Sequence, residues 1–366
     1  MKRWLPPFPA KKDDTSEKWT PLRIVSRGMC CAVGHTAPAA TAAINARLNH
    51  FRETEFVSQG AAPIVGGALF DVAVWGAERL KYMLYSVIDE ALAGLDLDTN
   101  QIAIVVIGAE TSRPGCPSHC LADALTELLE AQHALGKPFH AASRFCSYGK
   151  GGVAQAITAA ATILCGKNGA EYVLLASADC LLDAGAIEHF LSKERVASGD
   201  NTDGFIPAEG AAALLLSRKG ATSSAMWIEA AAAAQEEWCI DSDLPLRAKG
   251  LTEAMRSAAS ASGSDIAAMD FHASGMTGEG WYAKEVNLAL SRCMERKKPA
   301  FPHLIVTRST GETGSAAPLL TLAWLAGIMG HAYRSPGKTG LLHFAGDDGQ
   351  RSALVVRFRP SLGSAG

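Results

Sequence analysis

The chain has 366 residues, of which 48% are hydrophobic and 19% charged, with a formal net charge of −3. This composition excludes a disordered chain and gives no electrostatic reason to expect nucleic acid or an acidic membrane surface as a partner. No apolar run approaches the ~20 residues of a membrane span, and residues 1–21 carry charges and prolines without the apolar core of a signal peptide, so we expect an N-terminal arm on a cytoplasmic protein.

The cysteines number nine, an odd count without regular spacing, which indicates reduced and mostly buried thiols. The stretch CPSHC at 116–120 could be half of a zinc site. No second ligand pair stands at metal spacing, so we predict a loop with small buried thiols, no metal and no cofactor.

The first half of the chain alternates apolar strands with helices. In chain order, the patterns predict a strand at 21–34, helices at 36–51 and 79–95, a strand at 101–110, a helix at 121–135, a loop running into a small-residue helix at 144–166, and strands at 171–179 and 210–220. Strands that alternate with helices favour parallel sheets covered on both faces.

The second half repeats this order. The patterns predict a strand at 225–234 in spite of its alanines, a helix at 251–262, a strand at 266–275, a helix at 285–295, a strand at 303–309, a buried helix at 314–329, and a closing strand pair at 340–346 and 352–360. The similar order predicts an internal duplication, with an arm at 1–21, a first half at 22–220, a second half at 221–366 and a boundary near 217–225.

Polar loops follow the apolar strands, and in such sheets sites form at the carboxyl ends of strands. One loop carries His272, and another carries Arg308 and Glu312. Cys146 precedes a helix in the first half. A cysteine near a helix N-terminus with imidazoles nearby would suit acyl transfer, because both lower the thiol pKa and backbone N–H groups can hold an oxyanion.

Several motifs then add a resemblance. Residues 202–220, TDGFIPAEGAAALLLSRKG, resemble a β-ketoacyl synthase segment, and the stretches at 27–34, 271–280, 309–327 and 340–358 resemble other segments of that family in the same order. The similarity runs from about residue 22 to the end. It implies the thiolase fold, an α/β architecture in which duplicated βαβαβαββ halves form five layers, α-β-α-β-α.

The resemblance is less complete at the site residues. In an ungapped register it places Gly149 at the position of the family's nucleophilic cysteine, with Cys146 one helical turn too early. It implies that His272 is the first catalytic histidine and that Glu312 replaces the second. The remaining family positions, all linked to substrate binding or to the gate over the site, fall on Thr307, Arg308, Gly311, Phe344, Ala345, Gly346 and Asp347.

Glycine supplies no nucleophile, and a carboxylate at the second site would repel the malonyl carboxylate and the enolate. The resemblance therefore implies a non-catalytic accessory subunit, either of the chain-length-factor type or, from a looser similarity at residues 28–54, an adaptor or chaperone for type VI secretion cargo. The alternative is an active 3-oxoacyl synthase or acyltransferase that uses Cys146 with His272 and Glu312.

The same resemblance implies the partners. The chain is expected to form a homodimer, or a heterodimer with another thiolase-fold subunit. The further partner would be a secretion effector or spike protein, or an acyl-carrier protein. We expect strand 171–179 and the loop before residue 144 to form the dimer contact. Asp203 and Glu209 are predicted to order the loop and the sheet edge, and Lys150 to lie in an ordinary helix start instead of a phosphate-binding loop.

Overall fold

The structure is a computed structural model that describes residues 19–115, 118–220 and 224–361. Nearly all of the expected N-terminal arm, residues 1–18, and Cys116 of the CPSHC stretch lie outside the described residues. Among the described helices, none combines the length and apolar character needed to cross a bilayer.

The first half contains seven strands and five helices among its described residues. Its elements are β1 (Leu22–Cys31), α1 (Ala37–Asn45), β2 (Arg52–Val57), β3 (Pro63–Gly66), α2 (Gly76–Leu92), β4 (Ile102–Gly108), α3 (Ser118–Ala134), β5 (Arg144–Ser147), α4 (Val153–Cys165), β6 (Tyr172–Cys180), α5 (Ala184–Ser192) and β7 (Glu209–Ser217). The predicted helix at 36–51 ends at Asn45, and the β2–β3 hairpin, β5 and α5 were not predicted.

The second half follows the predicted order closely. Its elements are β8 (Ala225–Gln235), α6 (Lys249–Ala261), β9 (Phe271–Ser274), α7 (Gly280–Cys293), β10 (His303–Ile305), α8 (Thr307–Thr310), α9 (Ala317–Ile328), β11 (Thr339–Ala345) and β12 (Gln350–Arg359). The strand predicted at 303–309 is wrong at its end, because the chain turns into α8 after Ile305.

The strand order confirms the duplication. The first repeat runs β5-β4-β6-β7-β1 and the second β10-β9-β11-β12-β8, which is the order 3-2-4-5-1 in each when strands are numbered along the repeat. In both, three strands are parallel, and the last strand is antiparallel to both its neighbours. The sheets are therefore mixed, where the alternation of elements had predicted parallel ones.

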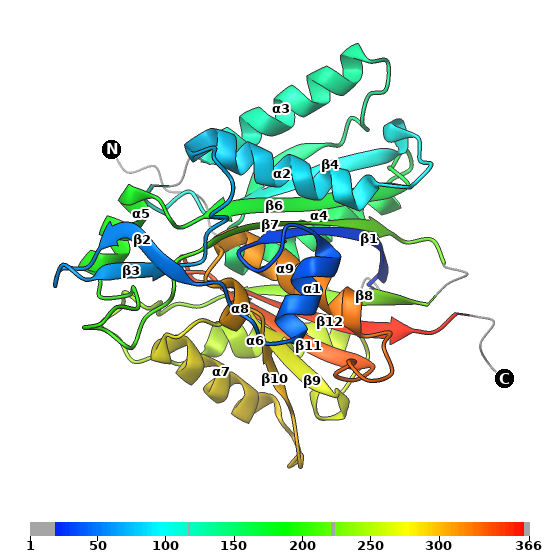
Figure 1. Cartoon of the computed structure of the whole chain (residues 1–366). Coiled ribbons are helices and arrows are strands. Elements are labelled where there is room, and N and C mark those ends of the chain that lie inside the picture. The colour runs from blue at the N-terminus through cyan, green and yellow to red at the C-terminus, as the bar shows by residue number, and fades with distance from the viewer. Residues whose placement is uncertain (1–18, 116–117, 221–223, 362–366) are drawn as a thin grey trace, which may run out of the picture.

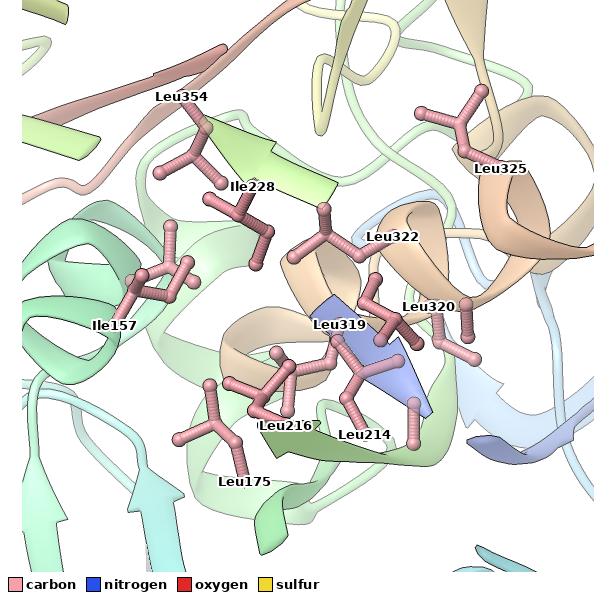
Figure 2. Packing of buried hydrophobic residues seen from close by; sticks show 14 of the residues in the cluster. Ile157, Leu175, Leu214, Leu216, Ile228, Leu319, Leu320, Leu322, Leu325 and Leu354 are labelled. Carbon is pink, nitrogen blue, oxygen red and sulfur yellow. The ribbon is translucent and has the colours of Figure 1, made fainter. Parts of the chain in front are cut away.

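The elements form the five expected layers, which Figure 1 shows from α3 and α2 at one side to α6 and α7 at the other. Helices α2 and α3 cover one half-sheet and α6 and α7 cover the other. Helices α4 and α9 lie between the half-sheets, and α9 is buried on all sides. Figure 2 shows this central packing, in which Leu319 and Leu322 of α9 lie among leucines and isoleucines of both repeats.

The half-sheets join along a short seam. Strand β1 pairs with β8 over two residue pairs, Leu22 with Ile228 and Arg23 with Trp227, so the ten strands form one hydrogen-bonded sheet. The strands at its two edges are β5 and β10.

The edge position corrects the predicted dimer contact. Strand β6 hydrogen-bonds to β4 on one side and β7 on the other, so the stretch 171–179 has no open edge for a partner strand. Strand β5, which begins at Arg144 directly after the predicted contact loop, is the edge of the first repeat. Only an edge strand presents unpaired backbone groups to another chain.

Candidate functional site

Gly149, the residue that the resemblance predicts at the nucleophile's position, lies in the turn between β5 and α4. Its φ is 61° and its ψ −171°, a combination that is essentially restricted to glycine. The backbone N–H of Gly149 donates to the Gly108 carbonyl at the end of β4, which fixes the turn against that strand. A Cβ at Gly149 would lie 2.4 Å from Oε2 of Glu110, so a carboxylate takes the space that a side chain here would need.

Lys150 and Glu312 form a buried ion pair beside Gly149. The Lys150 Nζ donates to Glu312 Oε2 at 2.5 Å, and Gly314 N donates to Glu312 Oε1 at 2.8 Å. Their side chains are 16% and 6% exposed. Burial works against the Lys150 ammonium, but the Glu312 carboxylate outweighs it and raises the pKa of Lys150 above its ordinary value. The pair thus joins the two repeats through opposite charges.

A second ionic group lies on the other side of Lys150. The Arg195 guanidinium donates to Glu279 Oε1 at 2.6 Å and to Asp347 Oδ2 at 2.7 Å, and the Tyr282 hydroxyl also donates to Asp347. Burial alone would raise the pKa of Asp347, but Arg195 holds it down at about 2. Asp347 belongs to the loop that the resemblance assigns to the gate, so an arginine pins that loop in place.

A third pair lies at the carboxyl end of β6. Arg113 donates to both oxygens of Asp179, at 2.8 and 2.5 Å, and Ser315 N donates to Asp179 Oδ2 at 2.7 Å. The backbone of Gly314 passes directly over this pair, since an added Cβ would lie 2.2 Å from Asp179 Oδ2. The start of α9 is therefore fixed to β6 through a buried carboxylate.

These ionic groups leave little space inside. The cavity bounded by Glu110, Lys150, Arg195 and Asp347 has a volume of about 30 Å³, and a neighbouring cavity bounded by Lys150, Ser274 and His343 has about 20 Å³. Each holds about one water molecule. Phe344 lines the smaller cavity and Gly346 the larger. An acyl chain does not fit in either.

A larger cavity of about 370 Å³ remains on the outer side of Glu312. Thr307, Arg308 and Gly311, three of the predicted substrate-binding residues, line it together with Glu312. The structure therefore brings these four residues together, but the inner chamber beyond them is filled by ion pairs.

His272, the other predicted catalytic residue, lies in a histidine cluster. The alternation along β9 puts His272 on the sheet face opposite the central layer, because Phe271 and Ala273 face that layer. His272 Nδ1 lies 3.1 Å from His343 Nε2, and the ring of His272 stacks on His303 with centroids 4.0 Å apart and planes 17° apart. His303 Nε2 lies 2.7 Å from Ser274 Oγ.

The three histidine rings could hold a metal ion by composition, since their ligand atoms lie within 4.8 Å of one another. Their orientation does not fit one. A histidine binds a metal through a nitrogen lone pair that lies in the plane of its ring. The His272 and His303 rings are stacked with nearly parallel planes, so one metal ion cannot lie in both ring planes and close to a nitrogen of each ring. The cluster is instead held by one hydrogen bond between His272 and His343, by ring stacking and by the hydrogen bond of His303 to Ser274.

We expect the histidine cluster to make the fold sensitive to acid. Burial lowers the pKa of His272 to about 3 and of His303 to about 4, against about 6.5 in an unfolded chain. Below pH 6.5 the unfolded chain therefore binds more protons than the folded one, and the free energy of unfolding falls by up to about 1.4 kcal/mol per pH unit for each histidine. Urea unfolding between pH 7.5 and 4.5 measures this slope.

The matched variants are His272→Phe and His133→Gln. The first removes a cluster member and should flatten the pH slope, whereas His133 is exposed on α3 and its replacement should leave the slope unchanged. Equal slopes for the wild type and His272→Phe would contradict the prediction.

Cys146 lies in β5, half-buried, on the face of the strand that packs against the central core. Its side chain interacts with Tyr148. Among the described residues, no hydrogen bond joins Cys146 to His272 or Glu312: His272 bonds to His343, and Glu312 to Lys150 and Gly314. The three members of the alternative catalytic set thus lie in three different environments.

The sequence interpretation missed most of the charged groups at this site. Glu110 and Asp179 could have been found, because each closes an apolar strand at its carboxyl end. Arg195 and Glu279 carry no comparable signal, since each lies in a loop and their pairing depends on tertiary packing. The predicted structural roles are confirmed for Glu209, which pairs with Arg79 at 2.5 Å, and for Asp203, which accepts from Gly280 N at the start of α7. Lys150 lies in a helix start, as predicted.

Comparison with known proteins finds matches in structure but none in sequence. No protein-family profile and no curated protein sequence matches the chain. Solved structures do: a chain from a type II PKS acyl-carrier protein in complex with its ketosynthase bound to the hexaketide has a TM-score of 0.76 at 14% identity, over 92% of this chain and 99% of that one.

Two more structures show the same likeness. The complex of a ketosynthase with its chain length factor from Xenorhabdus doucetiae matches with a TM-score of 0.67 at 13% identity, over 93% of this chain and 98% of that one. The ketosynthase from module 6 of the bacillaene synthase of Bacillus subtilis 168 matches with a TM-score of 0.70 at 12% identity, over 92% and 72%. The chain therefore has the thiolase fold of ketosynthases and chain length factors.

Proposed function

We propose that this chain is a non-catalytic thiolase-fold subunit that acts through protein association. One observation carries the proposal: the Glu110 carboxylate and the Lys150–Glu312 ion pair fill the space around Gly149, the residue predicted at the nucleophile's position. A condensing enzyme needs a thiolate to hold the acyl chain and a chamber to receive it. Losing a covalent nucleophile typically costs several orders of magnitude in rate.

The partner is proposed to be a second thiolase-fold chain. Matched structures include a ketosynthase together with its chain length factor, in three different systems. Strand β5 offers an open edge in the first repeat, and β-strand addition at that edge would extend the sheet into a partner. Either a second copy or a different subunit could supply that strand, and an acyl-carrier protein would then be bound by the assembly.

The surface supports association as well. A cavity of about 560 Å³ is lined by the exposed side chains of Leu48 (56%) and Phe70 (39%), and Trp75 near the start of α2 is 73% exposed. Large apolar side chains that gather on a surface are typical of binding sites. The adaptor or chaperone role for secretion cargo would use such a surface and stays a prediction.

A thioester transfer assay tests the proposal. In an active acyltransferase the Cys146 thiolate attacks the thioester carbonyl, the coenzyme A thiolate leaves, and the protein gains the mass of the acyl group. We expect no such gain after incubation with acetyl- or malonyl-coenzyme A at pH 7.5, measured by intact mass. Cys165 is the exposed one among the described cysteines, so the Cys165→Ala variant removes the described thiol most open to nonspecific acylation.

A stoichiometric adduct that survives in Cys165→Ala and disappears in Cys146→Ala would overturn the proposal in favour of the active acyltransferase. Light scattering on the purified chain gives the second measurement: a dimer, or a monomer that dimerises with a co-expressed thiolase-fold subunit, supports the association role.

A further inference from the structure

A polar cavity lies at the end of β1 remote from Gly149. Its volume is about 420 Å³, and it is lined by residues 23–27 of β1, by residues 224–226 at the start of β8, by residues 326, 327, 330 and 331 at the end of α9, and by Phe358. This volume falls in the range of small-molecule sites. The opposite end of β1 pairs with Gly210, beside Glu209, on the side of the candidate site.

Two arginines face this cavity without a partner. The Nε atoms of Arg23 and Arg27 are buried and have no hydrogen-bond partner, and neither guanidinium forms an ion pair or hydrogen bond with any residue in the part of the chain that the structure describes. Other buried arginines of this chain, such as Arg195, are bonded to carboxylates. Among the described residues that line the cavity, none is acidic.

Glu90 is the carboxylate that acts on Arg27 from a distance. Burial lowers the pKa of Arg27 and Glu90 opposes this effect. Both Glu90 oxygens are already engaged, because they accept from Met29 N at 2.9 Å and from Ala37 N at 2.7 Å. Among the described residues, no hydrogen bond or ion pair joins Glu90 to either guanidinium group of the cavity.

The end of α9 makes room for one of these arginines. An added Cβ at Gly327 would lie 2.7 Å from Nη2 of Arg27, so glycine at this position lets the guanidinium lie close against the helix, and a larger residue would displace it. Glycine inside a helix costs about 1 kcal/mol relative to alanine. His331 and Ser224 complete the polar wall, and the Ser224 hydroxyl accepts from Ser361 N, which leaves its own hydrogen free to donate.

We propose that this cavity binds the phosphate group of a small molecule, with Arg23 and Arg27 as its two cationic partners. Two guanidinium groups match the charge of a phosphate dianion, and arginine donors suit phosphate oxygens in geometry. Removing cations from water without an anion is costly, and a bound dianion would offset that cost. The site is separate from the Lys150–Glu312 pair and does not depend on whether the chain is catalytic.

The experiment is a titration of the full-length chain with inorganic phosphate and, separately, with glycerol phosphate, at ionic strength held constant with potassium chloride. Calorimetry gives the affinity and thermal unfolding gives the stabilisation. We expect saturable binding and a Tm that rises with ligand. Tighter binding of glycerol phosphate identifies a phosphate ester as the ligand class, and tighter binding of inorganic phosphate overturns that class in favour of the free ion.

The variants are Arg27→Met and Arg23→Gln, with Arg47→Gln as a matched control on an exposed arginine at the end of α1. Arg27→Met should weaken phosphate binding at least tenfold and, without ligand, should raise Tm, because it removes a half-buried cation whose buried Nε has no partner but keeps the aliphatic stem. A purely structural arginine would give a lower Tm instead. Absence of saturable binding to the wild type, or binding that Arg27→Met and Arg23→Gln leave unchanged, would overturn the proposal.

Discussion

Replacing Glu312 with glutamine should lower the free energy of unfolding by about 3 kcal/mol or more. The substitution keeps the shape of the side chain but leaves the Lys150 ammonium buried without its carboxylate, and breaking a buried ion pair in this way typically costs about 3–5 kcal/mol. Lys150→Met should lower the free energy of unfolding by a similar amount, because it leaves the buried Glu312 carboxylate without its cation. Urea unfolding at pH 7.5 measures both.

The Lys150→Met, Glu312→Gln double variant should lose clearly less than the sum of the two single losses, since neither charge then remains unpaired. An exposed pair provides the control. Lys81 bonds to Glu127 at 2.8 Å, and the Glu127 side chain is 55% exposed, so Glu127→Gln should cost less than about 1 kcal/mol. If Glu312→Gln costs no more than Glu127→Gln, the inner chamber is hydrated and open, and the account of a filled site fails.

Gly149→Ala should be the second large loss, at about 3 kcal/mol or more. The backbone there has a positive φ that disfavours any side chain by about 1–3 kcal/mol. The new methyl group would also meet the Glu110 carboxylate at 2.4 Å. Thermal and urea unfolding give the loss, and removal of the obstacle in a Gly149→Ala, Glu110→Ala variant should recover part of it.

Gly94 supplies the matched control for this prediction. It also has a positive φ, of 71°, but an added Cβ there would meet nothing within 4 Å. Gly94→Ala should therefore show the backbone cost alone, about 1–2 kcal/mol. Equal losses at the two glycines would mean that Glu110 does not fill the nucleophile's space.

The sequence predicted the strongly patterned elements of the fold and missed the weak ones. The run of alanines at 230–234 was correctly predicted as strand, because it continues an apolar stretch of β8 that pairs along its length with β12. Strand β5 was not predicted, because it has four residues and pairs on one side only, so little of it is buried. The β2–β3 hairpin lies outside the main sheet, and although burial alternates along its strands, its exposed positions include the apolar residues Val57 and Val65, so the sequence shows no polar–apolar alternation.

The position of the site stays a prediction from the resemblance, and its ionic chemistry was not predicted. The ungapped register that put Gly149 at the nucleophile's position agrees with a backbone conformation that only glycine adopts readily. The resemblance at 309–327 also assigned Thr307, Arg308, Gly311 and Glu312 to the site, and these four residues line one cavity. It could not show that Lys150 would neutralise Glu312, since the two residues lie 162 positions apart and meet only when the repeats pack together.

The seam between the repeats has one more consequence. Only two residue pairs link β1 to β8, whereas α9 is apolar on every side and needs both half-sheets to cover it. A chain of half this length would expose its central helix to water. It would have to dimerise with a second copy to bury that surface. The two repeats therefore resemble two associated subunits joined in one chain. Burial of the shared helical layer holds the repeats together, and the connecting segment only links them covalently.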